Sequence, residues 1–242
     1  MSRKPRAYQA DQTAHIYLCG NNQQRCFYCT ADYQYYSLLL SKGLVKYEVL
    51  LHAYVLMENH IQLLLTPSCS KGIASLIQYI SSSYVRYINR KYQRSGSLFQ
   101  GRHKASIVDA DNYLLACMRF IESDPVSKGI VSHLAQYPYS SYTQNAVHQQ
   151  VSTSLVVVNQ HRQYLHLGPN LVSRKSNYQK LFLHSSQQYL DTLIIERLMH
   201  NFPIGDEFFI EHIEALHHIK FNRMKLGRPS KPVKLMLPVI FC

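Results

Sequence analysis

The 242-residue sequence contains no tryptophan, only six cysteines and fewer acidic than basic residues. No apolar run approaches the roughly 20 residues that span a bilayer, and the N-terminus lacks the apolar segment of a secretory signal. Cys26 and Cys29 form a lone Cys-x-x-Cys pair, without the second pair that a zinc ribbon needs. These absences predict a cytoplasmic protein with reduced thiols and no membrane partner.

Apolar residues make up 46% of the chain, which is enough for a hydrophobic core. Lys and Arg number 26 against 14 Asp and Glu, a formal net charge of +12. An excess of this size indicates a polyanionic partner, most commonly nucleic acid.

The positive charge is concentrated in two runs that contain no acid. Cations of this kind neutralise phosphates, so we interpret the first run as a DNA-binding surface rather than a solvated helix face. The second run surrounds a Gly-Arg-Pro core, which is equally typical of a minor-groove contact and of a solubilising tail. RNA binding by the same surfaces stays open. The candidate DNA-binding residues are Arg86, Arg90, Lys91, Arg94, Arg102 and Lys104 in the first run, and Lys225, Arg228 and Lys231 in the second.

Hydrophobic periodicity predicts strands and helices that alternate through the first half of the chain. A strand at 15–19, a helix at 32–46, a strand hairpin at 49–57 and 61–65, a helix at 72–92 and a strand at 103–108 follow in order. Asp109 or Asp111 then begins a helix that runs through Ile121 and that Pro125 ends. This order predicts an α+β fold of ferredoxin-like type, an antiparallel sheet with helices on one face.

The second half of the chain has a weaker pattern. We expect helices at about 178–187, 189–200 and 206–218. The predicted organisation is therefore a domain at 1–143, a linker at 144–176 and a helical appendage with the basic tail at 177–242.

His60 and Gln62 are two residues apart at the start of a predicted strand, so both side chains lie on one face of the sheet. One imidazole nitrogen and one amide oxygen are potential ligands of a divalent cation. A buried, hydrogen-bonded histidine is the simpler alternative for this pair alone.

Several segments together resemble one protein family. HAYVLMENHIQLLLTP (52–67) resembles the strand-turn-strand of single-tyrosine, IS200-like transposases, which carry a His-hydrophobe-His motif. AHIYLCGNNQ, the stretch from SYVRYINRK to FIESDPVSKGIV, YPYSSY and LGRPSKP match other parts of that family in order, most closely its REP-associated tyrosine transposases. The resemblance is nearly continuous from about His15 to Tyr142.

The resemblance implies a metal-dependent enzyme that acts on single-stranded or hairpin DNA, as a monomer or a homodimer. In the family, two histidines and a residue on a later helix bind the metal, and a tyrosine attacks a phosphodiester. The matching positions here are His60, Gln62 and Asp124 for the metal and Phe120 for the tyrosine. Asp124 adds a negative charge that suits Mg²⁺ or Mn²⁺, whereas Phe120 has no hydroxyl with which to attack.

The sequence therefore predicts a DNA-binding protein on a transposase scaffold with impaired catalysis. The alternative is an active transposase in which Tyr113 replaces the missing nucleophile. Tyr113 is two helical turns from Phe120, roughly 10 Å along the axis, so this alternative requires a different path for the DNA.

Overall fold

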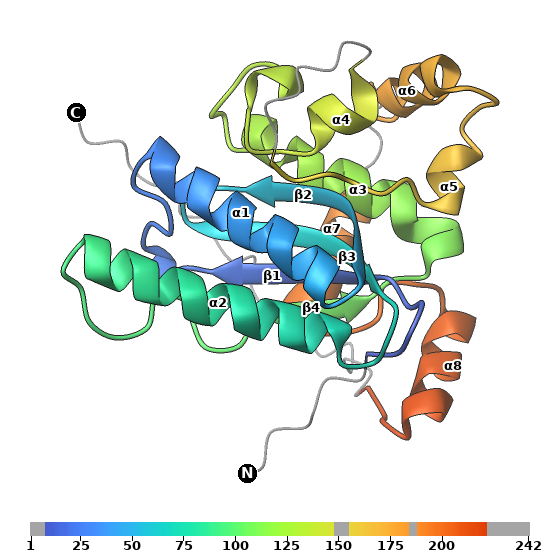
Figure 1. Cartoon of the computed structure of the whole chain (residues 1–242). Helices are drawn as coiled ribbons and strands as arrows, with labels where there is room; N and C mark the ends of the chain where they lie inside the picture. The colour runs from blue at the N-terminus through green and yellow to red at the C-terminus, as the bar shows by residue number, and fades with distance from the viewer. Residues whose placement is uncertain (1–7, 148–154, 184–187, 222–242) are drawn as a thin grey trace, which may run out of the picture.

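The computed structural model describes residues 8–147, 155–183 and 188–221, and Figure 1 shows how their helices and strands are arranged. The basic tail with Lys225, Arg228 and Lys231 lies outside the described residues, so its contact with DNA stays a prediction. None of the helices in the described part of the chain is long and apolar enough to cross a membrane.

A four-stranded sheet lies at the centre of the fold (Figure 1). All neighbouring strands are antiparallel, in the order β2-β3-β1-β4. The connections β1-α1-β2-β3-α2-β4 and this strand order confirm the predicted α+β, ferredoxin-like class. The strands are β1 (Ala14–Cys19), β2 (Val49–Leu56), β3 (His60–Pro67) and β4 (Lys104–Ile107).

Two helices, α1 (Thr30–Lys46) and α2 (Gly72–Lys91), cover one face of the sheet. The apolar stripe predicted for α2 is buried as expected, because its members recur every three or four residues. Gly43 permits the close approach of these helices, since a Cβ there would lie 2.6 Å from Cδ1 of Leu76.

The opposite face is also covered by helices, α3 (Ala110–Ser127) and α7 (Gln188–His200), whereas the sequence predicts helices on one face only. Asp109 caps α3 by accepting a hydrogen bond from the backbone N–H of Asp111. The predicted end of this helix before Pro125 is wrong. Pro125 is buried inside the last turn, and the N–H of Lys128 still donates to the carbonyl of Asp124. Asp124 therefore belongs to α3 and faces the sheet with it.

The stretch predicted as a linker, 144–176, contains helical turns in its described part. The short helix α4 (Tyr142–Ala146), α5 (Arg162–Leu165) and α6 (Leu171–Lys180) follow one another here. α6 begins earlier than the helix expected at 178–187 because Asn170 caps it, and residues 184–187 lie outside the described residues. The side chains of Tyr164 and Tyr178 are buried in the same apolar cluster as α3.

The expected helices at 189–200 and 206–218 correspond to α7 and α8 (Glu207–His217). Between them the backbone of Ile204 pairs with the end of β4: its N–H donates to the carbonyl of Ile107, and its carbonyl accepts from Asp109. The C-terminal region is therefore built against the sheet. The division of the chain at 143 and 176 stays a prediction.

Candidate active site

The candidate site is formed by alternate residues of two neighbouring strands. His15 and Tyr17 of β1, and His60 and Gln62 of β3, share the face of the sheet that α3 covers. Tyr17 is directly opposite Gln62, and the rings of Tyr17 and His60 are 5.2 Å apart. Strand alternation thus brings the sequence-predicted pair to the face of the sheet that α3 covers.

Asp124 reaches this pair from the last turn of α3. Its Oδ2 atom is 2.5 Å from Nε2 of His60 and accepts a hydrogen bond of 2.9 Å from Nε2 of Gln62. On the other side of the His60 ring, Nδ1 is 2.8 Å from Oδ1 of Asn59. The three residues expected as metal ligands therefore meet at one point, although 62 residues separate Gln62 from Asp124.

The charge of Asp124 is stabilised by its neighbours. Burial by itself raises the pKa of this carboxyl group, but the hydrogen bond and charge of His60, with help from Lys128 and Gln62, hold the pKa below its usual value. Lys128 directly follows the last residue of α3, and its Nζ atom is 3.9 Å from Oδ1 of Asp124. Asp124 is thus an ionised acceptor at neutral pH.

A second histidine holds the other end of Gln62. Nε2 of His15 is 2.9 Å from Oε1 of Gln62, and the His15 side chain is fully buried. Burial lowers the pKa of His15 to about 4, against the opposing effects of Gln62 and Asp124, so the ring is neutral near pH 7. Its Nε2–H is therefore the donor to Gln62, and the amide NH₂ of Gln62 is directed at Asp124.

The donor set fits a hard divalent cation in part. One imidazole nitrogen and one carboxylate converge, and the contact of Nδ1 of His60 with Asn59 is the kind that orients metal-binding histidines. The third member is an amide, and its donor end faces Asp124. Among the described residues, no three His, Cys, Asp or Glu side chains are grouped so that they could hold a metal ion.

Phe120 lies one turn before Asp124 on the same face of α3. Its half-buried ring packs edge-on against His15, with 6.0 Å between ring centroids. The residue at the family's tyrosine position is therefore next to the candidate ligands and carries no hydroxyl. Tyr113 lies seven residues before Phe120 on α3, half-buried against the apolar cluster that α3 forms with the sheet.

The basic residues of the first run have different surroundings. Arg86, Arg90 and Arg102 are exposed. Lys91, by contrast, is 2.6 Å from the fully buried carboxylate of Asp32. The sequence run contains no acid, but the fold supplies one from α1.

Arg94 also has a partner, since its guanidinium donates to Oε1 of Gln24 at 3.0 Å. Arg102 and the half-buried Lys104 instead line a cavity of about 530 Å³. This basic cavity is also lined by Tyr17 of β1 and by Met199 and Asn201 at the end of α7. Because the ring of Tyr17 also packs on His60, the cavity adjoins the candidate site.

Sequence reasoning missed Tyr17 and His15, and it missed the contribution of α7. The signal for the first two was present, because period-two alternation from His15 places Tyr17 on the same side of β1. The position of Met199 and Asn201 beside β4 carries no local sequence signal, since it depends on how α7 packs.

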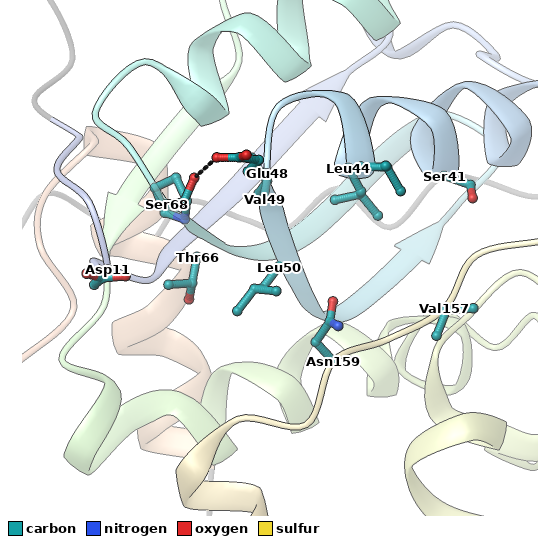
Figure 2. A pocket seen from close by; sticks show the side chains of 12 residues that line it. Asp11, Ser41, Leu44, Glu48, Val49, Leu50, Thr66, Ser68, Val157 and Asn159 are labelled. Carbon is teal, nitrogen blue, oxygen red and sulfur yellow. Dashed lines mark hydrogen bonds between the residues drawn. The ribbon is translucent and has the colours of Figure 1, made fainter.

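A second cavity of about 530 Å³ lies at the other end of β3 (Figure 2). It is lined by apolar side chains that include Leu44, Val49 and Val157, and its rim carries the hydrogen bond from Ser68 to Glu48. Thr66 and Pro67 end β3 here, whereas His60 begins it. This cavity is therefore separate from the candidate site.

Comparisons with known proteins agree with this architecture. A solved structure of a REP-associated tyrosine transposase bound to a REP hairpin has a similar fold, with a TM-score of 0.52, 16% sequence identity, and coverage of 66% of this chain and 92% of its own. A candidate transposase from Deinococcus radiodurans R1 aligns over 48% of this chain and 93% of its own, with 12% identity and a TM-score of 0.35. No curated protein matches this sequence.

The family model described as transposase IS200 like matches residues 8–124, which include the sheet, its two covering helices and α3 as far as Asp124. Residues 8–124 are therefore similar to the transposases of the IS200-like family.

Proposed function

We propose that this chain binds single-stranded or hairpin DNA at the His60 site and does not form a covalent bond with it. The observation that carries this proposal is Phe120. It is one turn from Asp124 and packs on His15, so it occupies the family's nucleophile position without a hydroxyl. The domain thus keeps the scaffold and lacks the group that would attack the phosphodiester.

The basic cavity supports a path for the DNA strand. Arg102 and Lys104 line it, and Tyr17 joins it to His60. Cations hold the phosphates of a single strand, and aromatic faces stack on its bases. The relative of similar fold is bound to a REP hairpin, which favours a hairpin among the possible ligands.

A divalent cation, Mg²⁺ or Mn²⁺, is part of the proposal. Nε2 of His60 and Oδ2 of Asp124 would hold it, together with the amide oxygen of Gln62 once that amide turns. When bound, such an ion polarises a phosphate oxygen of the DNA. The charge of Asp124 offsets the loss of the family's second imidazole.

Two measurements, one of DNA binding and one of covalent bond formation, test the proposed function. Fluorescence anisotropy with a labelled DNA hairpin that has a single-stranded overhang should show binding, and Arg102→Ala should weaken it. Lys42, an exposed cation on α1, provides the matched control: Lys42→Ala should bind as the native chain does. In parallel, the hairpin is incubated with Mg²⁺ or Mn²⁺ and run on a denaturing gel. A covalent band would contradict the proposal and would make Tyr17 and Tyr113 the tyrosines to replace.

A further inference from the structure

Gln62 has one acceptor end and one donor end, and the structure uses both. Its Oε1 accepts from His15 at 2.9 Å, and its Nε2 donates to Asp124 at 2.9 Å. A cation beside Asp124 needs the acceptor end on that side. In this arrangement Gln62 therefore presents the wrong end to a cation.

We propose that His15 is a positioning residue that controls cation binding by setting the orientation of the Gln62 amide. This inference rests on the proposed cation site and names the residue that regulates it. With its proton on Nε2, His15 donates to Oε1 and keeps the NH₂ group toward Asp124. For Oε1 to face the cation, the amide must rotate and His15 must carry its proton on Nδ1, so that Nε2 accepts from the rotated NH₂.

The surroundings of His15 show which tautomer is favoured without a cation. Among the described residues, Nδ1 of His15 has no hydrogen-bond partner although it is buried. Moving the proton to Nδ1 therefore buries an unpaired donor, which has an energetic cost. Ser106 of β4 is paired directly opposite His15, and its buried hydroxyl likewise has no hydrogen-bond partner within the part of the chain that the structure describes. A small movement that joins Nδ1 to this hydroxyl would accompany the rotation.

The first test is the affinity for Mn²⁺, measured by calorimetry on the full chain. His15→Phe removes the donor that holds Oε1, so the amide can rotate without a change of tautomer. Because one neutral hydrogen bond is at stake, we expect Mn²⁺ to bind about two- to tenfold more tightly than in the native protein. His52→Phe is the matched control. His52 is also a buried histidine beside β3, but it contacts Asn159 and Thr66 instead of Gln62, and its replacement should leave the affinity unchanged.

The second test separates orientation from packing. In Gln62→Glu, the carboxylate has two acceptor oxygens, one for His15 and one for the cation, so no rotation is needed. Adding His15→Phe to Gln62→Glu should therefore not increase Mn²⁺ affinity. The effect of His15→Phe on Mn²⁺ affinity is thus measured twice, once with Gln62 present and once in the Gln62→Glu variant. The difference between these two effects is the coupling energy between His15 and the Gln62 amide.

The third test reads the tautomer in the native protein and does not depend on any variant folding. Nitrogen NMR of the His15 ring should place the proton on Nε2 without a cation and on Nδ1 with saturating Mg²⁺. A proton on Nδ1 without a cation would overturn the inference. So would equal Mn²⁺ affinities of the native protein and a folded His15→Phe variant, or no Mn²⁺ binding by either. Hairpin binding is measured separately, so none of these outcomes would contradict the proposed DNA binding. If the native chain did not bind the hairpin, the proposed DNA binding would be wrong, and the inference about His15 would still be decided by the Mn²⁺ measurements.

Discussion

The ammonium group of Lys91 lies 2.6 Å from Oδ1 of Asp32, a carboxylate with 0% side-chain exposure. The same carboxylate accepts hydrogen bonds from the hydroxyls of Tyr87 and Tyr92 and from the backbone of residues 28 and 29. Lys91 is thus part of a polar cluster that joins the start of α1 to the end of α2. This pairing divides the first basic run into cations that support the fold and cations that are available to DNA.

The salt dependence of hairpin binding should reveal that division. Each phosphate contact on a single strand contributes about 0.7 to the slope of log K against log salt. Replacing Arg102 and Lys104 with Ala should therefore flatten the slope by about 1.4. Lys91→Ala should leave the slope unchanged and lower the stability of the protein. The measurement is a salt titration with fluorescence anisotropy, paired with chemical unfolding of each variant. An equal flattening by Lys91→Ala would show that Lys91 contacts DNA directly.

The contribution of Glu122 to the stability of the protein should fall as the pH rises between about 4.5 and 7. Burial raises the pKa of Glu122 to about 7, even though the hydrogen bonds from Ser141, Tyr178 and Asn145 each lower it. The unfolded chain releases this proton near pH 4.5 and the folded chain near pH 7, so the folded state binds more protons in between. The contribution of Glu122 to stability is therefore present below pH 4.5 and is lost as the pH rises to 7, by about 3 kcal/mol.

Denaturant unfolding at several pH values measures this effect. Glu122→Gln keeps the shape of the side chain and cannot ionise, so the native protein should lose stability relative to this variant across the same window. A Gln variant whose stability has the same pH dependence as that of the native protein would contradict the assignment to Glu122.

Restoring the nucleophile should restore covalent chemistry. Phe120 is half-buried beside His15, and tyrosine differs from it by one hydroxyl, so Phe120→Tyr should fold. Combined with Gln62→His, and then with Asp124→Asn, it should give a covalent band with hairpin DNA and Mn²⁺ on a denaturing gel. The same combinations with Phe120 retained are the matched controls. If the restored variants fold and bind DNA but form no band, the loss of activity extends beyond these three positions.

The packing of α7 on α3 should depend on one ion pair. The guanidinium of Arg119, 8% exposed, pairs with the carboxylate of Asp191, and Nε of Arg119 has no partner among the described residues. Asp191→Ala leaves a buried charge unpaired and should cost about 2 kcal/mol, a value reduced because Asp191 is partly exposed. Arg119→Met removes the charge and keeps an apolar side chain, so it should cost less. Chemical unfolding compares the two variants, and a larger loss for Arg119→Met would show that the pair is stabilising in itself.

Much of the fold follows from local patterns in the sequence. The apolar runs at 49–57 and 61–65 predict two strands and the apolar stripe at 72–92 predicts a helix, and the structure confirms all three: β2 and β3 are buried nearly throughout, and the stripe of α2 is buried. The end of α3 was misjudged for a physical reason. A proline disfavours helix in the preceding residue, but the burial of Ile121, Glu122 and Pro125 outweighs that local preference.

The residue types at the candidate site were determined by the sequence alone: an imidazole, an amide and a carboxylate where a metal site is expected, and a phenylalanine where a tyrosine is expected. The spacing of His60 and Gln62 also predicted their common face, because alternation in a strand is local. Only the tertiary structure decided which end of Gln62 faces Asp124, which acid neutralises Lys91, and which C-terminal residues close the basic cavity. Those contacts join residues from distant parts of the chain, so they depend on how helices pack against the sheet, and no local pattern records that.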